Sequence, residues 1–207
     1  MIIRRLWAGE RHDVRELYLQ LNSEDRRLRF FSNMTDAAIE KYVSNLDFSE
    51  NTILGAFDGS ARLCGTLELI HASNRHEVEL AIVVAESARG RGCGRALVNR
   101  AWEEARTMGC DRLTLVTLSE NKAMQALADR LQMHTRFVDG DVESSRDLTP
   151  ASPKETAQNI AREFFSTALW STAKSLRMAR ELGQANNSLK QQIIKGNVLP
   201  NKGTPKA

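Results

Sequence analysis

The chain has 207 residues, of which 42% are hydrophobic and 27% are charged, and its formal net charge is +3. This composition is typical of a globular domain of ordinary size with its own core, and it excludes collagen-like, disordered and membrane-embedded classes. The charge is uneven, because residues 146–207 hold ten Lys or Arg against four Asp or Glu, which leaves 19 against 22 before them. The basic charge of residues 146–207 is therefore informative about surface contacts and not about the chemistry of the residues before them.

Targeting and metal-binding signals are absent from the sequence. No stretch approaches the roughly 18 consecutive apolar residues of a membrane span, and the first five residues lead into no apolar signal segment. The three cysteines, Cys64, Cys93 and Cys110, are odd in number and form no C-x-x-C pair, so neither a disulfide framework nor a zinc ribbon is indicated. We therefore expect a cytoplasmic protein without a bound metal.

The first part of the chain has the pattern of one strand followed by helices. Residues 2–6 predict a strand, and residues 14–21 carry apolar side chains at the spacing of one helix face. Ser23 and Thr35 are suited to begin two further short helices, because their hydroxyls can accept hydrogen bonds from the first unpaired amides.

Near residue 52 the hydrophobic period changes to that of strands. Two apolar runs, 53–57 and 63–69, flank Asp58-Gly59, which is a strong hairpin turn signal. A third run, 78–84, is apolar enough at its end to be a central strand. These runs predict consecutive strands of one sheet.

A glycine-rich loop follows, and beyond it helices and strands alternate. The predicted elements are a helix over 96–108 that stops at Gly109, a strand over 113–118, a helix capped by Ser119 and a strand over 133–138. The whole order implies a mixed sheet with helices on its faces, and hence an α/β fold.

The end of the chain is organised differently from residues 1–140, which we take as one domain. Residues 141–155 are rich in turn formers and predict a linker. Residues 156–195 predict an amphipathic helical tail that packs on its own domain or on a second copy, as a homodimer. Its basic charge leaves contact with nucleic acid or with a membrane as alternatives, and residues 196–207 are predicted to be disordered.

The segment 84–98 carries the clearest chemical signal. It contains a strand end, the alternating glycines Gly90, Gly92 and Gly94, and the start of a helix. Glycines let successive N–H groups point into one concavity, and a new helix adds unpaired amides and the positive end of its dipole. The sequence has no G-x-x-x-x-G-K-[ST] pattern, and Arg95 stands where the dinucleotide fingerprint needs its third glycine. The loop therefore predicts a phosphate site of another kind.

Two motifs in this region resemble those of the GNAT superfamily of N-acetyltransferases. Arg89-x-x-Gly92-x-Gly94, between a strand and an amphipathic helix, is similar to the central motif of that family. Asn121-x-x-Met124-x-x-Leu127 on the next helix is similar to its second motif. The resemblance implies a GNAT-like central sheet, mixed but mostly antiparallel and flanked by helices, with acetyl-CoA as cosubstrate.

The resemblance also implies where the cosubstrate binds. Two strands part near the loop, and the thioester arm lies between them, so that Ile82 and Val84 would offer backbone groups and Asn121 would lie near the arm. The pyrophosphate would be bound by the loop residues Arg89, Gly90, Arg91, Gly92, Cys93 and Gly94. A nucleophilic role for Cys93 is disfavoured against a small buried residue, because no His partner lies within sequence reach.

Residues 78–84 are further similar to a strand of bacterial protein lysine acetyltransferases, whose catalytic glutamate matches Glu79. Residues 21–35 resemble the acceptor-side helices of the same subfamily. A lysine amine has a reference pKa of about 10.4 and attacks a thioester only when deprotonated, so a base is needed near neutral pH. Glu79 is the candidate base, with Glu77 on the same strand face as a competitor and an ordinary surface role as the alternative.

The predicted activity is acetyl-CoA-dependent N-acetylation of a primary amine by direct attack, with a protein lysine preferred as acceptor. Acetylation of a small amine is a second possibility. A noncatalytic acyl-CoA-sensing module is a third, because Ala128 stands where many relatives have a tyrosine that protonates the leaving thiolate. The general acid is therefore unassigned.

Overall fold

The computed structural model describes residues 1–72 and 76–196 and, within α6, side chains as far as residue 191. Its elements are β1 (Ile2–Arg5), η1 (Ala8–Glu10), α1 (Arg11–Leu19), α2 (Ser23–Phe30), α3 (Asp36–Ser44), β2 (Thr52–Phe57), β3 (Leu63–His71), β4 (Glu77–Val84), η2 (Glu86–Ala88), α4 (Cys93–Thr107), β5 (Arg112–Leu118), α5 (Lys122–Arg130), β6 (His134–Val138), β7 (Asp141–Asp147) and α6 (Pro153–Gly196). Seven strands form one sheet in the order β1-β2-β3-β4-β5-β7-β6. Among the described strand pairs, β4 and β5 alone run parallel, which confirms the predicted mixed, mostly antiparallel sheet.

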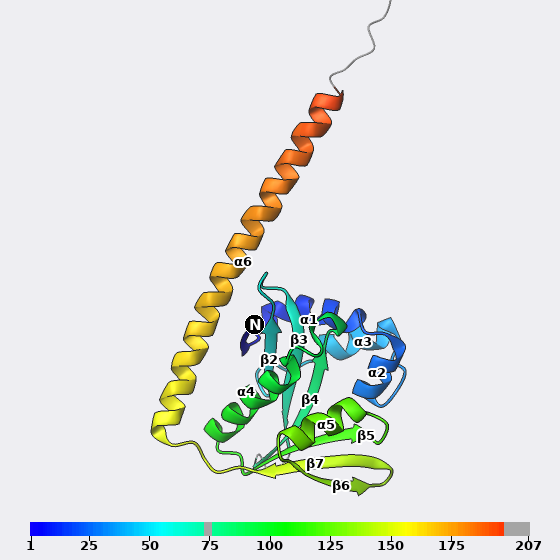
Figure 1. The fold of residues 1–207 in the computed structure, drawn as a ribbon, viewed down its shortest axis with the longest axis vertical. Helices are drawn as coiled ribbons and strands as arrows, with labels where there is room; N and C mark the ends of the chain where they lie inside the picture. The colour runs from blue at the N-terminus through cyan, green and yellow to red at the C-terminus, as the bar shows by residue number, and fades with distance from the viewer. Residues whose placement is uncertain (73–75, 197–207) are drawn as a thin grey trace, which may run out of the picture.

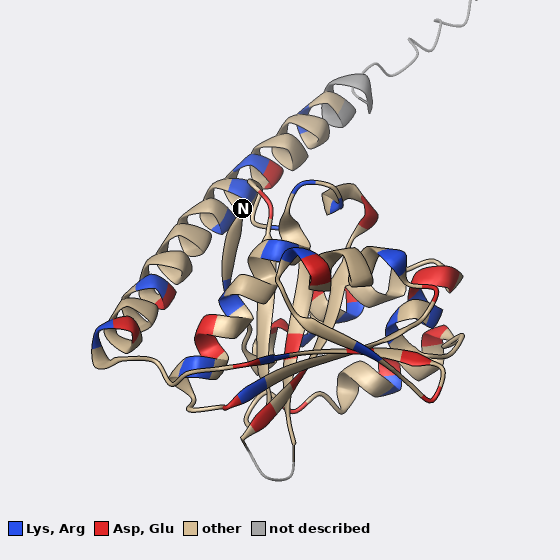
Figure 2. Cartoon of the chain, turned by 60° about the horizontal axis from the view of Figure 1, so that its bottom comes forward, with Lys and Arg blue, Asp and Glu red and all other residues tan. Residues whose placement is uncertain are grey.

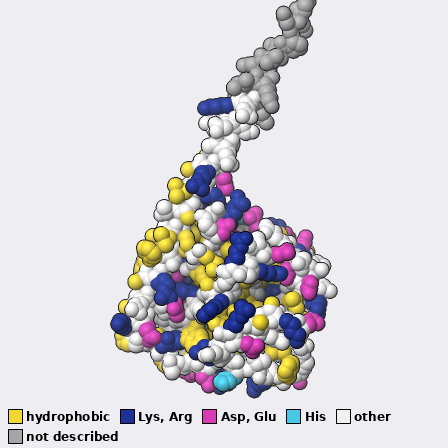
Figure 3. Space-filling model, viewed as in Figure 1, with side chains coloured by type: hydrophobic (Ala, Val, Ile, Leu, Met, Phe, Trp, Pro, Cys, Tyr) yellow, Lys and Arg dark blue, Asp and Glu magenta, His cyan; other side chains and the backbone are white. Residues whose placement is uncertain are grey.

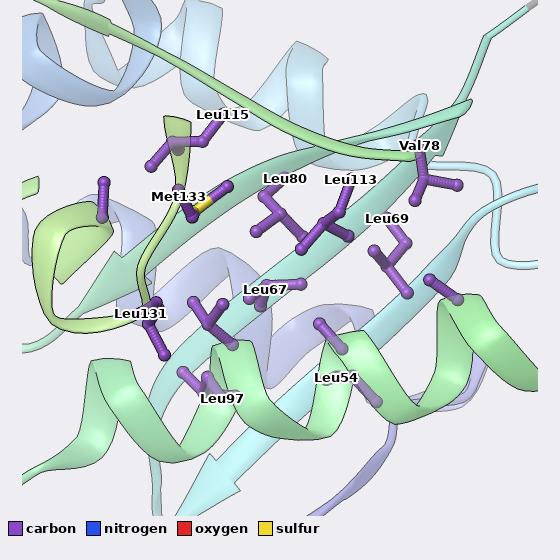
Figure 4. Packing of buried hydrophobic residues seen from close by; sticks show 14 of the residues in the cluster. Leu54, Leu67, Leu69, Val78, Leu80, Leu97, Leu113, Leu115, Leu131 and Met133 are labelled. Carbon is purple, nitrogen blue, oxygen red and sulfur yellow. The ribbon is translucent and has the colours of Figure 1, made fainter. Parts of the chain in front are cut away.

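The sheet separates two hydrophobic cores, because successive side chains of a strand point to opposite faces. One core lies between the sheet and the helices α4 and α5, where Leu67 and Leu80 pack with Leu97 (Figure 4). The other lies between the sheet and the helices α1 and α3, and it includes Val14 and Ile39. Each of these side chains is almost fully buried, which stabilises the fold by about 1.5–3 kcal/mol per large aliphatic residue.

The residue that caps the helix N-terminus is the predicted one in one helix and a different one in two others. Thr35 caps α3 as predicted, since its hydroxyl accepts the N–H of Ala38. The helix α2 is capped by Asn22 rather than Ser23, and α5 by Asn121 rather than Ser119. In both, the amide oxygen of the asparagine reaches the backbone N–H three residues further on, which is the usual capping geometry.

The prediction of a linker over 141–155 is wrong for its first half. Residues 141–147 form β7, which pairs along its length with β5 and also with β6. Val142 is the one apolar residue of this strand, so its sequence shows little hydrophobic alternation. Its position between two strands nevertheless satisfies its backbone on both sides. The folded domain thus extends beyond residue 140, and the irregular connection to α6 is limited to residues 148–152.

The helix α6 is 44 residues long and includes the predicted helical tail. Its first half lies beside β1 and α4, Arg177 contacts the Ala61 carbonyl, and the end of the helix extends beyond the body of the domain (Figure 1). Asn159 Nδ2 donates to Thr107 Oγ1 at 2.8 Å, and the Trp170 ring lies 5.5 Å from that of Phe57. Residues 197–207, which belong to the segment predicted to be disordered, lie outside the described residues.

Lys and Arg are spaced along α6 (Figure 2), and several exposed side chains of this helix are apolar. The exposed apolar side chains are Ile160, Phe164, Phe165, Leu169, Leu176, Met178, Leu182 and Leu189. The predicted homodimer contact, like the alternatives of nucleic acid and membrane, stays a prediction. None of the helices in the described ranges is long and apolar enough to cross a bilayer.

Candidate active site

The strands β4 and β5 part in the middle of the sheet. They pair at only three positions, of which the last joins Glu79 to Thr114. Beyond this point β4 continues against β3 and β5 continues against β7, so the two strands diverge (Figure 1). From Leu80 onward, the side of β4 that faces β5 therefore has no strand partner within the described chain.

The hydrogen bonds at the two ends of β4 show which of its residues face this gap. The His76 carbonyl accepts the Asp111 N–H at 2.7 Å on the side of β5, whereas the Ala85 N–H donates to the Cys64 carbonyl at 2.9 Å on the side of β3. Because these directions alternate along a strand, the backbone groups of Ile82 and Val84 point into the gap. The structure thus places both residues where the resemblance implies contacts with the thioester arm.

The loop over residues 89–94 lies at the end of the gap. Gly90 and Gly92 have φ values of +70° and +79°, a left-handed conformation that glycine adopts without a Cβ clash. The first hydrogen bond of α4 runs from the Ala96 N–H to the Gly92 carbonyl at 3.0 Å. The three amides before Ala96 therefore have no helical acceptor, and with the helix dipole they form a site suited to a pyrophosphate.

Arginines surround this loop but differ in their contacts. Arg89 donates from Nε to the Val84 carbonyl at 3.2 Å and pairs with Asp25 of α2 at 2.7 Å. Arg91 is exposed, and Arg95, which the motif does not single out, also lines the cavity described below. Figure 3, which has the same view as Figure 1, shows Lys and Arg side chains gathered in the middle of the face toward the viewer. This basic rim attracts anionic ligands.

Cys93 and Gly94 contribute to the packing beneath the loop. A Cβ on Gly94 would lie 3.6 Å from Leu127 Cδ2, so this glycine is at ordinary contact distance from α5. A hydrogen bond with Cys64, together with burial, raises the pKa of the Cys93 thiol. A buried, protonated thiol is a poor nucleophile, which favours the packing role over the covalent one.

A cavity of about 490 Å³ occupies the gap between the parted strands. The loop closes one end, α5 forms one wall and α2 forms another. Its lining includes Glu79, Ile82, Val84, Gly92, Thr117 and Asn121. Asn121 is almost fully buried, and its amide oxygen accepts the Met124 N–H at 3.2 Å, so this residue caps α5 while it faces the cavity. Within the described ranges, no group of side chains is arranged to hold a metal ion.

Glu79 lies where the strands part, on the face of the sheet that carries α1 to α3. Its side chain is exposed on one side and lines the cavity on the other. Partial burial raises the pKa of Glu79 above its ordinary value, Arg29 opposes this shift, and Glu143 adds to it. Glu77 does not belong to the cavity lining, so the structure brings only one of the two candidate bases to the site.

A buried polar network, which the sequence pattern did not reveal, supports the wall beside Glu79. Glu68 of β3 is 1% exposed and accepts hydrogen bonds from Tyr18, Tyr42 and Arg29, each at 2.8 Å. Arg29 also lines the cavity. Burial raises the pKa of Tyr42 to about 12 and that of Tyr18 well above its ordinary value. The sequence signal that could have indicated this network is the glutamate Glu68, which stands among apolar residues in β3.

Comparison with known proteins agrees with this geometry. The model of the family described as "Acetyltransferase (GNAT) family" matches residues 11–132, which is more than half of the chain. The chain belongs to the GNAT family. It is therefore an N-acetyltransferase by family, and enzymes of this family use acetyl-CoA or CoA.

Several solved GNAT structures share its fold. The GNAT domain of PAT from S. lividans has a TM-score of 0.61 and 22% identity, over 70% of this chain and 89% of that one. Ribosomal-protein-alanine N-acetyltransferase from Brucella melitensis has a TM-score of 0.57 and 19% identity, over 72% and 100%. Spermidine N-acetyltransferase from Vibrio cholerae, solved with CoA and spermine, has a TM-score of 0.57 and 21% identity, over 70% and 94%. At these identities the likeness concerns the fold, and the acceptors named range from a protein to a polyamine.

Proposed function

We propose that this protein transfers the acetyl group of acetyl-CoA to the side-chain amine of a lysine in a protein, with Glu79 as general base. The observation that carries the proposal is the position of the Glu79 carboxylate. It lies at the point where β4 and β5 part and is still exposed to solvent. A base at an open rim suits an acceptor that enters as a long side chain on a much larger molecule.

The cosubstrate would be held by backbone groups on the other side of the cavity. The loop amides before Ala96 and the start of α4 suit the pyrophosphate. The backbone groups of Ile82 and Val84 face the gap and suit the amides of the pantetheine arm. Arg89 already contacts the Val84 carbonyl, so the arm would compete with that hydrogen bond or use the Val84 N–H.

The chemistry then requires one proton acceptor and a polar environment for the developing oxyanion. The amine nitrogen forms a bond to the acetyl carbon, Glu79 takes the proton that the amine releases, and the carbon–sulfur bond breaks to leave the CoA thiolate. Backbone N–H groups in the gap are suited to stabilise the oxyanion. The raised pKa makes Glu79 a stronger base than an ordinary surface glutamate.

A small polycationic amine is the second candidate acceptor. The observation in its favour is Glu143 of β7, which lies close enough to Glu79 to raise its pKa. Two neighbouring carboxylates favour a ligand with two positive charges. Glu143 also pairs with Arg136 at 2.8 Å, which lowers the charge available to such a ligand.

The test is CoA thiol release from acetyl-CoA, measured with a panel of lysine-rich proteins and with linear polyamines. Glu79→Gln should lower kcat by about 10²–10⁴-fold, the range for loss of a general base, while acetyl-CoA binding is retained. Glu77→Gln is the matched control on the same strand face and should remain within about threefold of wild type. Wild-type protein that binds acetyl-CoA without turnover would favour a sensing module, and turnover of polyamines alone would favour the second acceptor.

A further inference from the structure

Thr117 of β5 carries a buried hydroxyl group whose binding partner is missing from the described chain. The residue is 2% exposed, and its Oγ1 has no hydrogen-bond partner among the described residues. Most buried polar groups in native proteins are hydrogen-bonded, because a hydroxyl removed from water without a partner costs free energy. The position of Thr117 in the cavity lining suggests a bound ligand as the missing partner.

The register of the sheet places Thr117 beside the gap. It pairs with Val142 of β7 and follows Thr114, the last β5 residue paired with β4, by three positions. Its side chain shares a face with that of Leu115, which belongs to the core under α4 and α5. Thr117 therefore lies past the point of divergence, on the face covered by α5.

No other hydroxyl reaches this cavity from the residues that the structure describes. Of those that line it, only Thr117 is a serine, threonine or tyrosine. Ala128 of α5, at the position where many relatives carry tyrosine, is fully buried in the same core. Ala128 is not among the residues that line the cavity, so the hydroxyl in the lining comes from β5.

We propose that the Thr117 hydroxyl donates a hydrogen bond to the thioester arm of acetyl-CoA and positions it between the parted strands. The inference rests on the proposed function, because it assumes that acetyl-CoA occupies this cavity. The arm offers acceptors in its two amide carbonyls and its thioester. No proton is transferred in this contact, so Thr117 acts as a positioning residue and the proton of the amine still passes to Glu79.

The proposed hydrogen bond from Thr117 predicts an effect on the stability of the ligand-free protein that a purely structural role of this residue would not have. If the hydroxyl has no partner until the arm binds, Thr117→Val should raise the melting temperature of the free protein, because valine has nearly the same shape without the polar group. The same substitution should weaken binding of the arm. Thr117→Ser, which keeps the hydroxyl, should retain most of the affinity.

The experiment measures dissociation constants of acetyl-CoA and of adenosine 3′,5′-bisphosphate, which lacks the arm, by titration calorimetry. Thr117→Val should weaken acetyl-CoA binding about five- to tenfold, the loss expected for one hydrogen bond, and leave the bisphosphate unchanged. Thr114→Val is the control on the same strand, since its Oγ1 donates to the Val78 carbonyl at 3.3 Å outside the cavity lining. It should leave both affinities unchanged.

Two results would overturn the inference. One is wild-type affinity of Thr117→Val for acetyl-CoA, and the other is an equal loss of affinity for both ligands, which would indicate a general distortion. In either case the proposed function would still stand, provided that the wild-type protein binds acetyl-CoA. If wild-type protein binds neither ligand, the proposed function fails as well, so the two failures are distinguishable.

Discussion

Replacement of Glu68 by glutamine tests whether the buried network under α2 holds the acceptor side of the cavity. Its carboxylate neutralises Arg29 and accepts hydrogen bonds from Tyr18 and Tyr42. Glutamine keeps the shape of the side chain but removes the charge, and its amide group replaces one acceptor oxygen with a donor. The guanidinium of Arg29 would then remain in a buried position without its counterion.

The expected loss of stability follows from the burial of this pair. The side chains of Arg29 and Glu68 are only 12% and 2% exposed, and breaking such a pair costs about 3–5 kcal/mol. Because glutamine still accepts one hydrogen bond, we expect about 3 kcal/mol. For a chain of this size, 1 kcal/mol changes the melting temperature by about 2–4 °C, so a decrease of about 6–12 °C should be seen.

Urea unfolding and thermal melting, followed by circular dichroism, measure this loss. The matched control is Glu40→Gln, which breaks the ion pair of Glu40 with Arg15, whose side chains are 46% and 41% exposed. An exposed pair contributes about 1 kcal/mol or less. The double variant Glu68→Gln, Arg29→Gln should recover part of the stability, because no buried charge is left unpaired. The reasoning is refuted if Glu68→Gln loses no more stability than Glu40→Gln.

Three further predictions concern titration and the loop. Burial raises the pKa of Tyr42 to about 12 from an ordinary 10.0, so its contribution to stability is complete below pH 10 and is lost as the pH rises toward 12. Tyr18 and Tyr42 are the two tyrosines of the chain, so tyrosinate absorbance should appear near pH 10 in urea but not in the folded protein. The same titration curve for folded and unfolded protein would contradict the network. Gly92→Ala should destabilise the chain by about 1–2 kcal/mol in urea unfolding, because φ is +79°, whereas Gly59→Ala, with open space around its Cβ, should have little effect. The kcat/KM of wild type should fall as the pH drops through the raised pKa of Glu79, and the same acid limb in Glu79→Gln would exclude this residue as the base.

The sequence was sufficient for the order of elements as far as β6 and for the position of the glycine-rich loop. Hydrophobic periodicity and turn residues act over a few neighbouring positions, so they indicated the strands of the first hairpin and the helix that follows the loop. The glycines of that loop are needed for a local backbone conformation, which explains why Gly90 and Gly92 could be identified without a structure. The long C-terminal helix was predicted for the same reason.

The tertiary structure alone decided the features that depend on segments far apart in the chain. The strand β7 has few apolar residues, and it became evident as a strand only through its pairing with β5 and β6. Glu68 meets tyrosines from α1 and α3, and the hydroxyl of Thr117 faces the cavity only because β4 and β5 part before it. The local sequence pattern indicates which backbone conformation a segment prefers. Strand pairing and side-chain burial depend instead on residues from distant segments, which come together only in the folded protein.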